Sequence, residues 1–287
     1  CPIYHYEPRP LTKLYENHQN FLGYMKSIGI QTAVLEAIYP GQQYQVTSPG
    51  KEPYEVQIVI ENDFFHRENF LNVLARKIKD WEYIFWIDAH QVFENLYWWE
   101  IALYKMEHKA TVQMFQYADY KFPSNATNLN LAGINYAGHL ATPFWKYHEV
   151  GRGLFAGNAW GIRREVYFEI DVILDYCIFG WCDHIWNIAT FKGKDDWVLW
   201  TFPQYEKMMK PWVDRTWEVF QKYGGGSYIW GDLFHIYHDR ESKENYGKWH
   251  KIIEKNKIDL WEAGLYRDED YVLRIKKDSY LDKLTRS

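Results

Sequence analysis

The sequence predicts a single α/β domain in which helices flank a mixed, mainly parallel sheet. Segments with the character of strands alternate with segments whose apolar residues recur at helical spacing, as is typical of parallel sheets covered by helices. The strand Tyr83–Asp88 is apolar until its last residue, which indicates burial on both faces. The chain has 287 residues, of which 47% are hydrophobic and 25% charged, so it can bury a sizeable core.

In the first part of the chain, each expected element follows from its apolar spacing and from the turn residues that bound it. Leu14, Phe21 and Met25 recur at helical spacing, and Gly29 is a residue of the kind that ends helices. In chain order we expect a strand end within 1–10, a helix at 11–27, a strand at 30–39, a polar loop at 40–53, a strand at 54–62, a helix at 67–78, a strand at 83–88, a helix at 96–109 and a strand at 110–118.

The second part of the chain is less regular. Residues 117–150 contain two prolines and a glycine-rich stretch, and we expect a long excursion over the sheet. After it we expect a strand or turn and then a helix within 154–170, a turn entering a helix at 179–191, an amphipathic helix at 202–222 broken by three glycines, a strand at 227–239 and a surface helix at 245–256.

The charge balance and the cysteine content exclude some classes of protein. Lys and Arg number 33 against 38 Asp and Glu, so there is no global basic excess of the kind that duplex nucleic acid requires. Three cysteines do not form a disulfide framework, which favours a reducing compartment, the cytoplasm. No apolar run reaches membrane-spanning length. We therefore do not expect nucleic acid as a partner or a transmembrane segment.

Asp88 and His90 are the first candidates for chemistry. In an extended segment, side chains two residues apart point to the same side, and a carboxylate with an imidazole suits Mn²⁺ or a similar divalent ion. His235 and His238, at the end of a late strand, could complete the coordination. Simpler interpretations remain, namely a polar loop for the first pair and a hydrogen bond to a carbonyl or water for each late histidine.

Asp183 lies at a turn that enters an apolar helix. It could be an N-cap with a purely structural role, or a general base that accepts a proton from a hydroxyl group, and spacing alone leaves both open. The nearby segment that contains Gly157, Asn158, Trp160 and Gly161 is also ambiguous. Its glycines allow a ligand to approach the backbone closely, but they equally serve a tight bend.

Taken in order, these segments resemble the GT-A glycosyltransferases. YIFWIDAHQVFEN resembles the apolar strand and D-x-D motif of that superfamily, with His90 in place of the second Asp, a variant found in some of its branches. FLNVLARKI resembles the helix before the motif, and GNAWGIRREVY followed by ILDYCIFGWCDH resembles the acceptor-side block. GDLFHIYHDRESKENYGKWHKII resembles the late histidine motif of bacterial and phage-type enzymes. The resemblance covers about residues 1–260.

The resemblance implies a GT-A, Rossmann-like fold and transfer of a hexosyl or pentosyl group from a nucleotide-sugar, with a UDP-sugar expected first and Mn²⁺ or Mg²⁺ as the metal. Asp88 and His90 would hold the metal against the diphosphate, with His238 the preferred third ligand and His235 the second choice. The expected donor contacts are Glu36 to the base or ribose, Arg67, Asn72, Asp88, Gly157, Asn158 and Trp160.

On the acceptor side, the resemblance implies direct displacement with inversion at the anomeric carbon and Asp183 as the general base. Residues 1–116 would form the donor and metal half, 117–240 the acceptor and catalytic half, and 241–287 a helical extension on the same domain. We expect a glycan hydroxyl as the acceptor, with a lipid-linked sugar or a protein side chain as alternatives. Trp145 and His148 lie where acceptor contacts are expected. The resemblance implies a bacterial protein or a viral protein in the host cytoplasm.

Two other classes of function stay open. A metal-dependent hydrolase would use Asp88, His90 and His238 to activate water, and would need no acceptor. A non-catalytic carbohydrate-binding protein would use some of the 15 Trp and 24 Tyr to stack on sugar rings, although aromatic residues also simply fill cores. The apolar strand that ends in Asp88 argues against this class, because lectin-like sandwiches use alternating strands.

Overall fold

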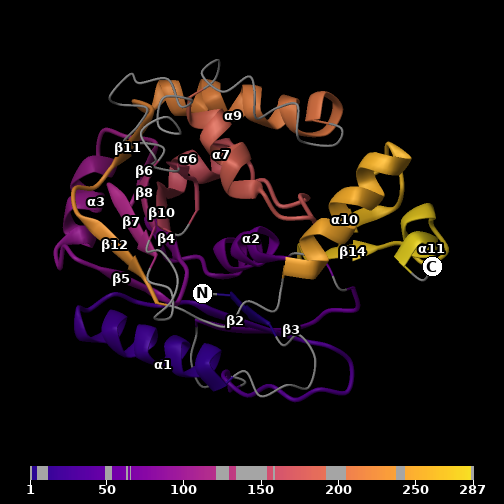
Figure 1. The fold of residues 1–287 in the computed structure, drawn as a ribbon, viewed down its shortest axis with the longest axis horizontal. Helices are drawn as coiled ribbons and strands as arrows, with labels where there is room; N and C mark the ends of the chain where they lie inside the picture. The colour runs from indigo at the N-terminus through magenta and orange to yellow at the C-terminus, as the bar shows by residue number, and fades with distance from the viewer. Residues whose placement is uncertain are drawn as a thin grey trace.

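The computed structural model of the chain describes residues 2–4, 12–48, 54–62, 64, 66–120, 129–133, 154–157, 159–191, 205–236 and 243–285. These residues form one mixed α/β domain in which helices pack against small sheets (Figure 1). Among them, no helix combines the length and the apolar character that crossing a lipid bilayer would require.

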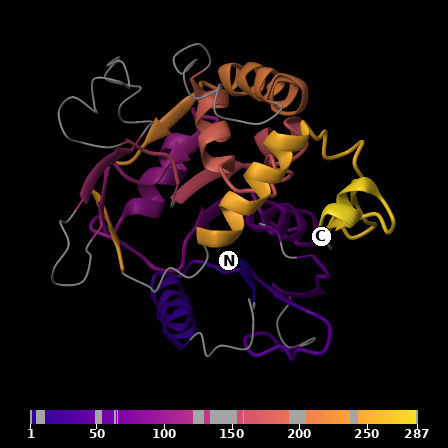
Figure 2. The same cartoon turned by 45° about the vertical axis from the view of Figure 1, so that its right-hand side comes forward.

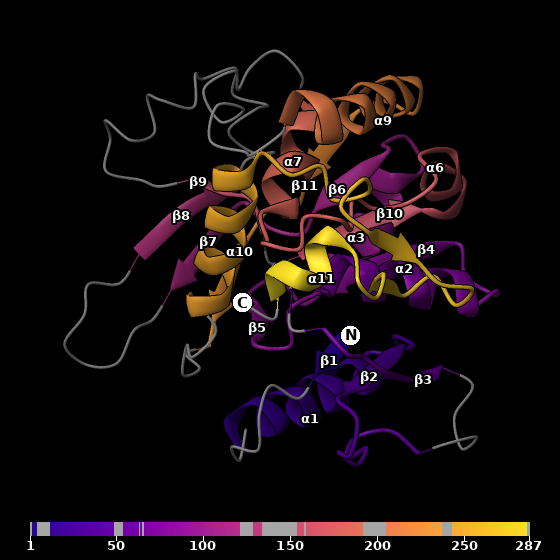
Figure 3. The same cartoon turned by 90° about the vertical axis from the view of Figure 1, so that its right-hand side faces the viewer.

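The N-terminal part of the chain forms a parallel sheet in the order β1-β2-β3. Its elements are β1 (Pro2–Tyr4), α1 (Thr12–Ser27), β2 (Val34–Ile38) and β3 (Glu55–Val59). In Figures 1 and 3, α1 lies below this sheet and α2 (Arg67–Lys77) above it. Phe70, Val73 and Leu74 of α2 pack on apolar side chains of β2 and β3, which fixes the helix on the sheet.

A second sheet has the order β11-β6-β10-β4. Its strands are β4 (Tyr83–Ile87), β6 (Thr111–Gln113), β10 (Ala159–Arg163) and β11 (Gly226–Tyr228). Strand β10 runs antiparallel to both of its neighbours, and β11 runs parallel to β6. A side chain at Gly161 would collide with Phe85 and Met114, so this glycine serves close packing between strands.

A third sheet joins distant parts of the chain in the order β5-β12-β7-β8-β9. Its strands are β5 (Gln91–Phe93), β7 (Tyr117–Tyr120), β8 (Leu129–Gly133), β9 (Leu154–Phe155) and β12 (Asp232–His235). The expected strand 110–118 is in fact two strands, β6 and β7, which belong to different sheets. The expected excursion 117–150 contains β7 and β8 of this sheet.

The remaining helices cover the sheets or extend from them. Helices α7 and α9 pack together on one side of the molecule (Figure 2), where Ile185, Trp186, Val213 and Phe220 share one apolar cluster. The elements are α3 (Trp98–Met106), α6 (Arg164–Glu169), α7 (Cys182–Thr190), the π-helical turn η1 (Tyr205–Met209), α9 (Lys210–Lys222), α10 (Lys243–Asn256), β13 (Leu265–Arg267), β14 (Leu273–Ile275) and α11 (Tyr280–Thr285). The C-terminal part is therefore not wholly helical, because β13 and β14 form an antiparallel hairpin.

The prediction of an α/β domain is confirmed, but the prediction of a mainly parallel sheet is wrong for the described strands. Of the ten pairs, five are parallel and five antiparallel. The parallel interpretation rested on the alternation of strands and helices and on the apolar strand β4. That strand lies at an edge of its sheet and only Trp86 in it is buried, so its apolar sequence reflects partial burial in an antiparallel pair. The GT-A arrangement itself stays a prediction.

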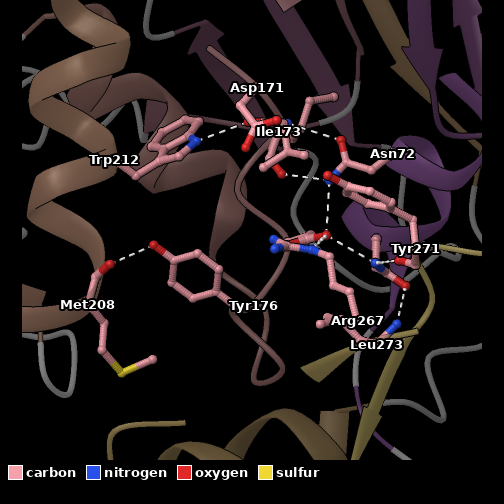
Figure 4. Close-up of polar contacts among 12 residues, drawn as sticks. Asn72, Asp171, Ile173, Tyr176, Met208, Trp212, Arg267, Tyr271 and Leu273 are labelled. Atoms are coloured by element: carbon pink, nitrogen blue, oxygen red, sulfur yellow. Dashed lines mark hydrogen bonds and ion pairs between the residues drawn. The ribbon is translucent and has the colours of Figure 1, made fainter. Parts of the chain in front are cut away.

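A buried polar network ties α2 to the segment before α7 and to the C-terminal hairpin (Figure 4). At its centre, the fully buried carboxylate of Asp175 accepts hydrogen bonds from Asn69 and Asn72 of α2, at 3.0 Å each, and from Arg267 of β13, at 2.5 Å. Asn69 also accepts a hydrogen bond from the backbone N–H of Leu273. The network fixes the rotation of α2, whose first turn carries Arg67.

Candidate functional site

The side chains of Asp88 and His90 lie close together, as predicted, but the backbone between them has a different geometry from the one expected. Strand β4 ends at Ile87, and residues 88–90 form a turn in which the backbone N–H of Gln91 donates to the carbonyl of Asp88 at 3.1 Å. The extended geometry was therefore wrong. The turn still brings Nε2 of His90 to 4.0 Å from Oδ2 of Asp88.

His235 joins this pair from the end of β12. Strands β5 and β12 are antiparallel neighbours, with Gln91 opposite His235, and the backbone N–H of Ile236 donates to the carbonyl of His90 at 2.8 Å. The imidazole rings of His90 and His235 consequently lie 4.3 Å apart between centroids. His238 lies outside the described residues. Within the part that is described, no group of three or more His, Cys, Asp or Glu side chains is arranged to hold a metal ion.

Arg67, at the start of α2, connects the D-x-H turn to Asp183. Its guanidinium donates to Oδ2 of Asp183 at 2.6 Å and lies 3.4 Å from Oδ1 of Asp88. It also makes two hydrogen bonds to Oε1 of Glu68, at 2.6 and 2.8 Å. We refer to these four side chains, Arg67, Glu68, Asp88 and Asp183, as the Arg67 cluster.

Negative charge is in excess in the Arg67 cluster, where three carboxylates surround one guanidinium. Burial alone would lower the pKa of Arg67, but the charges of Asp183, Glu68 and Asp88 together raise it above its ordinary value. Burial raises the pKa of Glu68, and Oε2 of that residue accepts no hydrogen bond from the described residues. The side chains of Arg67, Asp88 and Asp183 are 20–26% exposed, so a ligand can reach them.

Asp183 is held by a helix that is anchored on its other face. The buried Ile185, Trp186 and Ala189 of α7 pack into the largest apolar cluster, which leaves Asp183 on the polar side. The N-cap position is occupied by Trp181, and Asp183 lies within the first turn. The N-cap interpretation of Asp183 is therefore wrong, since its carboxylate binds Arg67 instead.

Glu36, a predicted contact to the base or ribose, has a structural role in the described fold. Its fully buried carboxylate accepts hydrogen bonds from the backbone N–H groups of Gln45, Val46 and Thr47, at 2.6–3.1 Å, and from the Thr47 hydroxyl at 2.7 Å. The loop after β2 therefore wraps around this carboxylate, which holds it in place. A contact with the donor stays a prediction.

Two further predicted donor contacts are buried in the protein. The amide of Asn72 donates to Ile173 O and Asp175, and accepts from Tyr167 and the N–H of Ile173, which fills its hydrogen-bonding capacity. Trp160 is fully buried and donates to the carbonyl of Ala156. We therefore assign both residues to packing rather than to donor binding, which corrects the sequence-based assignment.

The remaining predicted residues are only partly placed. Gly157 is buried between β9 and β10, and its carbonyl accepts a hydrogen bond from the backbone N–H of Ala159 at 3.1 Å. Asn158, Trp145 and His148 lie outside the described residues. Glu68 was not among the residues predicted from the sequence, although an acidic residue beside Arg67 at the start of a helix was a usable signal. Trp181 was not among them either, because the backbone conformation of a residue cannot be read from the sequence.

Comparisons with known proteins add no assignment to this geometry. Neither a protein-family model nor a curated protein sequence matches this chain. The function proposed below therefore depends on the chemistry of the Arg67 cluster and of the two histidines beside it.

Proposed function

We propose that the protein is a metal-dependent glycosyltransferase of the GT-A type, which moves a sugar from a nucleotide-sugar, expected to be a UDP-sugar, to a hydroxyl acceptor. One observation carries the proposal. Arg67 joins Asp88, the candidate metal ligand, to Asp183, the candidate base, although 95 residues separate the two in the chain. In such a transfer, the diphosphate leaves from one side of the anomeric carbon while the acceptor hydroxyl attacks from the other. The metal ligand that serves the diphosphate and the base that serves the hydroxyl must therefore lie near each other.

Asp88 and His90 are the residues that would hold the metal. A carboxylate oxygen and an imidazole nitrogen 4.0 Å apart suit a divalent ion of the Mn²⁺ or Mg²⁺ kind. Such ions are often held by one or two protein ligands together with substrate phosphates, so a two-residue set fits this use. When bound, the metal would neutralise negative charge on the departing diphosphate. His235, and His238 beyond the described residues, are candidates for a further ligand.

Arg67 has two roles in this proposal. Its guanidinium, which is always charged, can bind a diphosphate through two parallel hydrogen bonds. In the described state it donates a hydrogen bond to Oδ2 of Asp183 at 2.6 Å, so that this carboxylate oxygen is occupied. Binding of the diphosphate would draw the guanidinium toward the phosphates and free Asp183 to act as a base.

Asp183 would then take the proton of the acceptor hydroxyl. The acceptor oxygen forms a bond to the anomeric carbon while the bond from that carbon to the diphosphate oxygen breaks, and the diphosphate leaves with its electron pair. Direct displacement of this kind inverts the anomeric configuration. The hydrolase and carbohydrate-binding alternatives stay predictions. We favour the transferase because neither alternative gives the ion pair between Arg67 and Asp183 a role in function.

A panel of nucleotide-sugars tests the proposal by thermal shift, with and without Mn²⁺. A ligand that binds only the folded state at about 100 times its Kd adds roughly 2.7 kcal/mol of stability. For a domain of this size, that should raise the melting temperature by roughly 5 °C. We expect such a shift for at least one UDP-sugar with Mn²⁺ and a smaller one with EDTA. A panel with no shift at all would contradict the proposal.

A further inference from the structure

Trp181 has an unusual backbone conformation for so large a residue. Its φ is +73° and its ψ 4°, which is the left-handed region, and Gly180 before it has φ +84°. Left-handed backbone is strained for residues with a Cβ and free of that strain for glycine. A turn into α7 at this position would thus form more easily with glycine at 181. Strained residues of this kind are concentrated at functional sites.

Burial does not account for the tryptophan either. Its side chain is 48% exposed, and Trp230, at 59%, is the other strongly exposed tryptophan among the described residues. An indole with half of its surface in water stabilises the fold less than a buried one. Its flat apolar face, on the other hand, is well suited to packing on a ligand.

The indole belongs to the same helix start as the candidate base. Trp181 precedes Asp183 by two residues, and its ring lies 4.9 Å from that of His184, tilted by 50°. His184 in turn lies within electrostatic reach of Asp183. Burial lowers the pKa of His184, and the charge of Asp183 acts in the opposite direction. The exposed indole of Trp181, the imidazole of His184 and the carboxylate of Asp183 thus all belong to the N-cap and first turn of α7.

We propose that Trp181 is a specificity-determining residue for the acceptor, and that the acceptor is a saccharide whose pyranose ring stacks on the indole and presents a hydroxyl to Asp183. This inference rests on the proposed function for the role of Asp183. It selects a sugar ring over a lipid alcohol or a protein side chain, because the C–H face of a pyranose matches a flat aromatic ring in size and polarity. The ring also explains why a tryptophan occupies a position that suits glycine.

Saturation-transfer NMR with the methyl pyranosides of glucose, galactose and xylose tests this inference on the full chain, without any need for turnover. We expect at least one of them to bind the wild type. Trp181→Gly should weaken that binding tenfold or more, and Trp181→Phe should weaken it only a few fold. The glycine variant should melt within about 3 °C of the wild type, because relief of backbone strain offsets the lost contacts. Trp181→Asn, which also tolerates the left-handed region, is a second variant without an aromatic ring.

Trp230→Ala is the matched control, since it removes an indole that is more exposed than that of Trp181 and lies just before β12. It should leave pyranoside binding unchanged. Equal binding by the wild type and the two non-aromatic variants would overturn the inference, as would a wild type that binds none of the three sugars. The two hypotheses fail separately. Pyranoside binding through Trp181 in a protein that binds no nucleotide-sugar would support a sugar site at Trp181, but it would refute the proposed transfer reaction and with it the acceptor role.

Discussion

Replacing Asp183 with asparagine should lower the turnover number for sugar transfer by about 10²–10⁴-fold, the usual contribution of a general base. Asparagine has nearly the same shape and can still accept a hydrogen bond from Arg67, which keeps Asp88 and Glu68 as partners. It cannot take a proton from the acceptor hydroxyl. We therefore expect the Kd for UDP with Mn²⁺ to stay within a few fold of the wild-type value while transfer is lost. Turnover and calorimetric Kd, measured on the same preparation, check this.

The exposed ion pair between Asp270 and Lys77, 2.6 Å apart, provides the control for Asp183. Asp270→Asn removes the same charge from an Asp that is paired with a cation of the same helix, α2, and it should leave turnover unchanged. Undiminished turnover in Asp183→Asn would refute the base assignment. An equal loss of turnover and of UDP binding would instead mean that Asp183 acts only by holding Arg67 in place.

The second large effect concerns stability. Asp175→Ala should lower the free energy of unfolding by about 3–5 kcal/mol, because it leaves the charge of Arg267 without its buried partner. The same change removes one of the two acceptors of each amide, because Asn69 keeps only the carbonyl of Tyr271 and Asn72 only that of Ile173, and each unsatisfied buried N–H adds to the cost. Urea denaturation, with the slope compared between variants, measures the loss.

Two comparisons decide the origin of that effect. Asp270→Ala breaks an exposed pair and should cost about 1 kcal/mol or less. The double variant Asp175→Leu/Arg267→Met removes both charges of the pair and should recover part of the stability, because apolar residues of similar size often replace a buried ion pair at little cost. If Asp175→Ala is no more destabilising than Asp270→Ala, the network does not hold α2 as we describe.

Much of the local structure could be predicted from the sequence. The helix 11–27 with Gly29 after it, the helix 67–78 and the strand 83–88 correspond to α1, α2 and β4, because apolar spacing and turn residues act over a few positions. Asp88 and His90 were expected to meet a late histidine, His238 first and His235 second, and His235 is the one that the described residues place there. The turn at 88–90 was not expected, because it depends on β5 pairing with a strand 140 residues later in the sequence.

The roles of single polar residues could not be read in the same way. Asn72 and Trp160 were expected to bind the donor, but their partners, Asp175 and Ala156, are set by how distant segments pack. Glu36 accepts hydrogen bonds from backbone N–H groups of a loop, and every sequence has such groups, so this role cannot be predicted from residue types. The hydrogen bond from Arg67 to Asp183 joins residues that are 116 positions apart, so no local sequence pattern predicts it. Sequence patterns identify which residues are chemically capable, while burial decides which of them are free to act.

The most direct measurement of the central claim is a calorimetric titration of UDP into the wild type and into Asp88→Ala, each with Mn²⁺ and with EDTA. If Asp88 and His90 hold the metal against a diphosphate, the wild type should bind UDP at least tenfold more tightly with Mn²⁺. Asp88→Ala should lose that difference and keep its melting temperature, since the side chain of Asp88 is 26% exposed and its one ion pair to Arg67 is long at 3.4 Å. Equal affinity of the wild type for UDP with Mn²⁺ and with EDTA, or no binding under either condition, would contradict the claim.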